Sequence, residues 1–131
     1  MKILIDTDVL LDVALRHPEF FENSAAVFAW AESHPGQAAV AWHSISNISY
    51  LLRPDARRFI RELVEFVEIP PTGTEDMKLA LASPMTDLED SMQVAAAIAF
   101  RADRIVTRNL ADYRKSSVRV ISPADFVELS K

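Results

Sequence analysis

The chain contains no cysteine, which excludes disulfides, thiolate zinc sites and cysteine nucleophiles together. It has only two glycines, and no linker or repeat divides its 131 residues, so we expect one domain over 1–131. The longest apolar run, Val94 to Phe100, is far shorter than the roughly 20 residues of a membrane span. Because Asp6 also breaks the apolar start, we expect no signal peptide, no membrane partner and a cytoplasmic location.

An excess of positive charge is also lacking, since the formal net charge is −5. Nucleic-acid partners favour a basic surface, so the total counts mildly against one. However, ten of the fourteen basic residues are arginine, the side chain that best forks onto phosphate. Carboxylates gathered for a metal would themselves make the total negative, so the charge does not exclude a nucleic-acid partner.

Short apolar segments alternate with helical patterns along the chain. We expect strands at 2–5, 37–42, 104–107 and 118–121, and helices at 9–15, from Pro18 to His34, from Ser44 to Leu52, after Asp55, at 74–81, at 88–101 and from Pro123. The 88–101 helix is apolar almost all round after its first turn and should be buried. This alternation predicts a three-layer α/β/α sandwich with a mainly parallel sheet.

Acidic residues fall where the strands of such a sheet end. Asp6 follows the first strand, Asp112 lies five residues after Thr107, and Asp90 opens the buried helix that leads into that strand. Sites in parallel sheets lie beyond the carboxyl ends of the strands, so these three acids are expected to converge there. Clustered carboxylates repel one another unless a cation neutralises them. All-oxygen ligands favour Mg²⁺ or Mn²⁺ over zinc.

Each acid also has a plain structural interpretation. Asp6 could cap the helix that follows it. Thr86 and Glu89 match a capping box at the start of the buried helix. Asp112 could be an ordinary turn residue. Only the joint placement of the acids at strand ends favours a site.

Four segments resemble the PIN-domain nucleases, in the right order and over the whole chain. They are Ile5–Asp12, Leu88–Ala97, Thr107–Tyr113 and Ser122–Phe126. In the third, Tyr113 stands where phenylalanine is common. The resemblance implies a PIN-like α/β/α fold and an endoribonuclease dependent on Mg²⁺ or Mn²⁺. Many such bacterial proteins are VapC-type toxins, so it also implies an RNA substrate, a cognate antitoxin and a homodimer.

By position, the resemblance makes Asp6, Asp90 and Asp112 the catalytic, metal-binding acids. Thr107 and Asn109 would order the strand end, holding Asp112 or a bound water by hydrogen bonds.

One departure concerns a second acid that the family often carries after the second strand. Asn47 takes its place here, so Glu89 or Asp8 would supply the missing charge, or metal would bind more weakly.

Arg108 and Arg114 flank the Asp112 segment and are the candidates for RNA phosphate contacts. A further basic stretch, formed by Arg53, Arg57, Arg58 and Arg61, fits a solvated helix face equally well.

Two other functions stay open. Asp6-Thr7-Asp8 fits the opening of a haloacid-dehalogenase-like phosphatase, in which the first aspartate attacks phosphorus. That mechanism needs a lysine, and Lys78 is the only one in the middle of the chain. The missing second acid instead suggests a degenerate PIN domain that binds RNA or protein without catalysis.

Overall fold

A four-stranded parallel sheet forms the centre of the computed structural model, which describes residues 1–131. The strands are β1 (Ile3–Ile5), β2 (Ala38–Ala39), β3 (Arg104–Val106) and β4 (Arg119–Ile121). Their spatial order is β2-β1-β3-β4, and Leu4 of β1 pairs with both Ala39 and Ile105. The two central strands, β1 and β3, therefore end side by side at the same edge.

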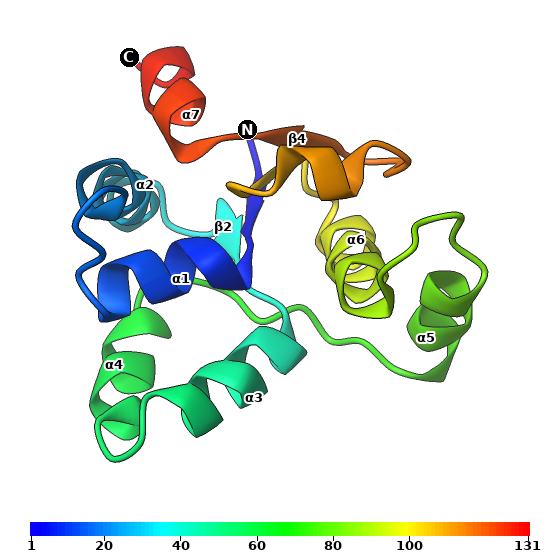
Figure 1. The fold of residues 1–131 in the computed structure, drawn as a ribbon, viewed down its shortest axis with the longest axis horizontal. Helices are drawn as coiled ribbons and strands as arrows, with labels where there is room; N and C mark the ends of the chain where they lie inside the picture. Colours follow the sequence, from blue (N-terminus) through cyan, green and yellow to red (C-terminus); the bar gives the residue numbers. More distant parts are fainter.

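Seven helices flank this sheet. They are α1 (Thr7–Ala14), α2 (Phe21–Ser33), α3 (Trp42–Leu51), α4 (Ala56–Leu63), α5 (Thr74–Leu81), α6 (Leu88–Phe100) and α7 (Pro123–Leu129). Figure 1 shows α1 and α2 on one side of β1 and β2, α6 and α5 on the other, and α3 and α4 as a helical pair below the sheet. None of the helices is both long and apolar enough to cross a membrane.

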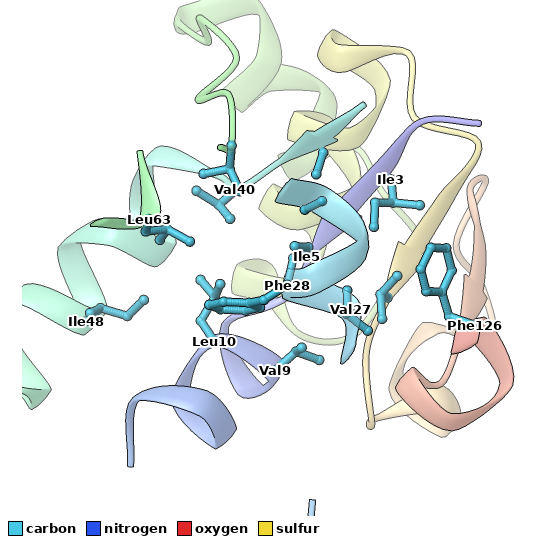
Figure 2. Packing of buried hydrophobic residues seen from close by; sticks show 14 of the residues in the cluster. Ile3, Ile5, Val9, Leu10, Val27, Phe28, Val40, Ile48, Leu63 and Phe126 are labelled. Carbon is cyan, nitrogen blue, oxygen red and sulfur yellow. The ribbon is translucent and has the colours of Figure 1, made fainter. Parts of the chain in front are cut away.

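Side chains of the central strands alternate between two buried cores. Ile3 and Ile5 of β1 pack against side chains of α1, α2 and α7, which include Phe28 and Phe126 (Figure 2). Leu4, between them, faces the opposite core with Ala97 of α6. Burial of both faces explains why β1 is apolar throughout and why β3 is apolar after Arg104. The predicted α/β/α sandwich with a parallel sheet is confirmed.

Several expected boundaries are wrong by a few residues. The strand expected at 37–42 pairs only at Ala38–Ala39, because the chain turns into α3 at Trp42 with Ala41 as its N-cap. Ser44 is therefore buried inside α3 instead of capping it. The capping box was also misplaced, since Asp87, not Thr86, caps α6. The second helix begins at Phe21 rather than Pro18.

Candidate functional site

A cavity of about 640 Å³ opens beside the ends of β1 and β3, and we call it the acid cleft. Three helices and the loop after β3 supply its lining, which comprises Asp6, Thr7, Asp8, Leu11, Ser46, Asn47, Tyr50, Leu51, Glu89, Asp90 and Asn109. Five of the acids and amides expected from the sequence therefore share one cavity with Asp6.

Asp6 is the most firmly held of these acids. Its Oδ1 accepts a hydrogen bond from the Thr7 amide at 2.7 Å, as a helix cap would. Its Oδ2 accepts from the hydroxyls of Thr107 at 2.8 Å and Tyr113 at 3.0 Å. Burial raises the pKa of Asp6 even though these donors oppose the shift. The Asp6 side chain therefore both caps α1 and lines the acid cleft.

Asp8 faces the same cleft from the first turn of α1. Its Oδ2 accepts the Arg108 amide at 3.0 Å, while its Oδ1 is buried with no hydrogen-bond partner. Burial, followed by the charge of Asp6, raises the pKa of Asp8 to about 6. A buried carboxylate oxygen without a partner is unfavourable, so this atom is a candidate ligand for a cation.

Asp90 projects from the first turn of α6. Its backbone amide donates to Oδ1 of the capping Asp87 at 3.0 Å, which leaves its own carboxyl group out of the cap. Burial and then the charges of Asp87, Asp6 and Asp112 raise the pKa of Asp90 to about 6. Asp90 therefore lies within electrostatic reach of both other predicted acids.

Asp112 lies in an adjoining pocket of about 390 Å³, in the 3-10 turn η1 (Leu110–Tyr113). Asp90 lines both this pocket and the acid cleft, and so links Asp112 to Asp6. No three histidine, aspartate or glutamate side chains lie close enough to hold one ion in this conformation. The three predicted acids thus lie in two adjoining cavities, and they do not form a closed ligand set.

Asn47, which the resemblance puts at the place of the second acid, lies on α3. Its Nδ2 donates to Glu89 Oε1 at 3.0 Å, across the acid cleft from α3 to α6. Glu89 and Asp8, the two side chains expected to replace the missing charge, both line the cleft.

The Asn109 carbonyl accepts the Asp112 amide at 3.1 Å, whereas Thr107 makes no hydrogen bond to Asp112. The Thr107 hydroxyl donates to Asp6 instead of holding Asp112, and it accepts the Asn109 amide at 3.1 Å. Because Thr107 ends the strand next to β1, the nearest carboxylate is the one that follows β1.

Arg108 also has a partner that the sequence did not reveal. Its guanidinium forks onto Asp12 at 2.8 and 3.0 Å and lies 4.0 Å from the centre of the Phe20 ring. Asp12 is only 2% exposed and also accepts the Ser24 hydroxyl, so the pair is structural. Arg114, by contrast, is exposed beside Asp112, where a phosphate contact is open to it.

Gln93 was missed altogether. It is buried on α6, one turn after Asp90, and its Nε2 donates to Ser44 at 2.7 Å and Thr7 at 3.1 Å. This network joins α1, α3 and α6, the three helices that line the cleft. The available signal was a lone glutamine in an otherwise apolar helix, which usually requires buried hydrogen-bond partners.

The phosphatase interpretation finds no support in the cleft. Lys78 is exposed on α5, next to Glu75, and lines neither the acid cleft nor the Asp112 pocket.

Comparison with known proteins gives a consistent assignment. A family model described as PIN domain matches residues 2–111, from the first strand to the residue before Asp112. The crystal structure of FitAcB from Neisseria gonorrhoeae aligns with a TM-score of 0.60 and 16% identity, covering 93% of this chain and 98% of that chain. At this identity the likeness supports the fold alone, and no curated protein matches the chain. On the extent of the family match, the chain belongs to the PIN domain family.

Proposed function

We propose that the chain is a divalent-metal-dependent endoribonuclease that hydrolyses RNA phosphodiester bonds. The observation that carries this proposal is the acid cleft itself, in which Asp6, Asp8 and Asp90 face one another with raised pKa values. Carboxylates held together against their own repulsion are typical of a site that a cation neutralises.

The donor set suits Mg²⁺ or Mn²⁺, because it is made of carboxylate and amide oxygens with one buried carboxylate oxygen of Asp8 unpartnered. We assign Asp6, Asp90 and Asp112 as the ligands, with Asp8, Asn47 and Glu89 in support. Asp112 would be the exposed member of this ligand set, whereas Asp6 is buried. When bound, the ion would clamp a phosphate oxygen and lower the pKa of an attacking water.

The remaining side chains orient this chemistry. Thr107 and Tyr113 fix the carboxylate plane of Asp6 by donating to the same oxygen. Asn47 holds Glu89 at the cleft wall. Arg114 is placed to contact a substrate phosphate on the Asp112 side.

The resemblance to VapC-type toxins extends the proposal to a toxin restrained by an antitoxin and to a homodimer. Both remain predictions. The product of the neighbouring gene, co-purified with the chain, tests the first, and light scattering of the purified chain tests the second.

The central test measures metal binding and cleavage on the same protein. Calorimetric titration with Mn²⁺ should give saturable binding and a raised melting temperature. A labelled single-stranded RNA should be cut only when Mn²⁺ or Mg²⁺ is present. Asp90→Asn should abolish cleavage with the fold intact, whereas Asp125→Asn, an exposed acid on α7 outside both cavities, should cut normally.

Two outcomes would overturn the proposal. Absence of both Mn²⁺ binding and cleavage would leave the non-catalytic module as the better account. Full cleavage by Asp90→Asn would remove the metal site assigned here.

A further inference from the structure

Two large aromatic side chains on α3 are left in solvent. Trp42, at the start of α3, and Tyr50, near its end, are each 68% exposed. Aromatic rings are normally buried, so two such rings on one helix indicate a contact surface. Tyr50 lines the acid cleft, and Trp42 lines the neighbouring groove.

That groove runs between α3 and α4 and has a volume of about 540 Å³. We call it the α3–α4 groove, and its lining includes Trp42, Ser46, Ser49, Arg57, Ile60 and Arg61. Ser46 also lines the acid cleft, so the two cavities share a wall on α3. In Figure 1, α3 and α4 form the helical pair that borders this groove.

The charge of the groove opposes that of the chain as a whole. Arg57 and Arg61 lie one turn apart on α4, both exposed, and no carboxylate lies within salt-bridge distance of either. The guanidinium of Arg53 lies 4.5 Å from the centre of the Tyr50 ring. An unpaired basic stretch beside exposed rings, on a chain of net charge −5, points to a polyanion.

We propose that the α3–α4 groove binds single-stranded RNA and leads it into the acid cleft. Bases would stack on Tyr50 and Trp42, and phosphates would contact Arg57 and Arg61. A single strand is specified because stacking on side chains requires unpaired bases, which a duplex keeps inside. The inference rests on the proposed function, since it supplies the substrate path to that same site.

Fluorescence anisotropy with a short labelled RNA tests the inference in the presence of EDTA, where no metal-dependent cleavage takes place. The single strand should bind about tenfold more tightly than its duplex. Tyr50→Ala should weaken binding about tenfold, as expected for one lost stack, and Tyr50→Phe should recover most of the affinity because it keeps the ring.

The arginines are tested by salt dependence. Arg57→Ala should lower the slope of log K against log salt by about 0.7, the value for one contact with a single strand. Arg58→Ala is the matched control, because Arg58 is exposed on the same helix but does not line the groove. Equal effects of the two variants would show a diffuse charge effect and overturn the inference.

Binding and cleavage separate this inference from the proposed function. Groove-dependent RNA binding without metal-dependent cleavage would contradict the nuclease alone. Cleavage with affinities unchanged in Tyr50→Ala, Trp42→Ala and Arg57→Ala would contradict the groove alone. The latter result would instead favour a protein partner on this surface.

Discussion

Asp6 is 5% exposed and receives three hydrogen bonds, whereas Asp112 is exposed and its carboxylate receives none from the protein. Both were expected to serve one metal ion. The two ends of the site therefore differ in construction, with one carboxylate fixed at a strand end and the other free in a turn.

Asp90 lies between these two ends, and the charges of Asp6 and Asp112 both contribute to its raised pKa. In the proposed nuclease, the fixed end would set the position of the chemistry, and the free end would leave room for substrate and metal to enter.

The largest expected effect comes from removing either end of the site. Asp6→Ala and Asp112→Ala should each lower cleavage by about 100-fold or more, because each removes a proposed ligand of the ion that would stabilise the transition state. Their stabilities should differ. Asp6→Ala leaves the Thr107 and Tyr113 hydroxyls without their acceptor and should lower the free energy of unfolding by about 1 to 2 kcal/mol. Asp112→Ala should stay within about 0.5 kcal/mol of the parent protein.

Urea unfolding of the metal-free variants measures the difference. Asp125→Ala, on exposed α7, controls for the loss of one surface carboxylate. Equal stabilities for Asp6→Ala and Asp112→Ala would contradict the division into a fixed and a free end.

A smaller effect distinguishes Arg108, which pairs with the buried Asp12, from Arg114, which lies beside Asp112. Arg108→Ala would leave Asp12 buried with only Ser24 as partner, and should cost about 2 to 3 kcal/mol of stability. Arg114→Ala should leave stability unchanged and weaken RNA binding. Thermal unfolding and anisotropy, run on both variants, measure the two effects.

Double replacement by Asp12→Asn and Arg108→Gln provides the control, because it removes both charges of the pair and should recover part of the stability. An Arg108→Ala protein as stable as the parent, but deficient in RNA binding, would restore the phosphate role expected from the sequence.

The sequence predicted the elements that depend on local pattern. Strand β1 is apolar throughout, β3 is apolar after Arg104, and α6 is apolar around most of its surface. These elements could therefore be recognised from local pattern alone. Edge strand β2 could not be delimited in this way. Only two of its residues pair, and the point where α3 begins is set by packing against neighbours distant in sequence.

The site was predictable as a location but not as a set of contacts. Strand ends indicated where Asp6 and Thr107 would lie, yet the bond between them spans 101 positions. Tyr113 was noticed only as a replacement for phenylalanine, whereas its hydroxyl donates to Asp6. The exposure of Trp42 depends on where α3 starts. Because the sequence predicted a strand at 37–42, it did not predict that Trp42 would be exposed.

The smallest expected effect is a pH dependence of stability, which reports the burial of Asp8 and Asp90 and, after it, the repulsion from neighbouring carboxylates. The pKa values of Asp8 and Asp90 are about 6 in the folded chain, above the ordinary value of 3.8. Between about pH 4 and 6 the folded state holds protons that the unfolded state releases, so stability should fall as pH rises and then level off. His43 acts in the opposite direction below its ordinary pKa of 6.5, because burial lowers its pKa.

The difference between the parent and Asp90→Asn cancels the contribution of His43. Melting temperatures of the metal-free proteins should therefore converge near pH 4 and separate by a few degrees near pH 7, with Asp90→Asn the more stable. At pH 7, saturating Mn²⁺ should raise the melting temperature of the parent protein and leave that of Asp90→Asn nearly unchanged. A parent that gains stability relative to Asp90→Asn as pH rises would mean that the fold stabilises Asp90 as an anion, and would contradict its raised pKa.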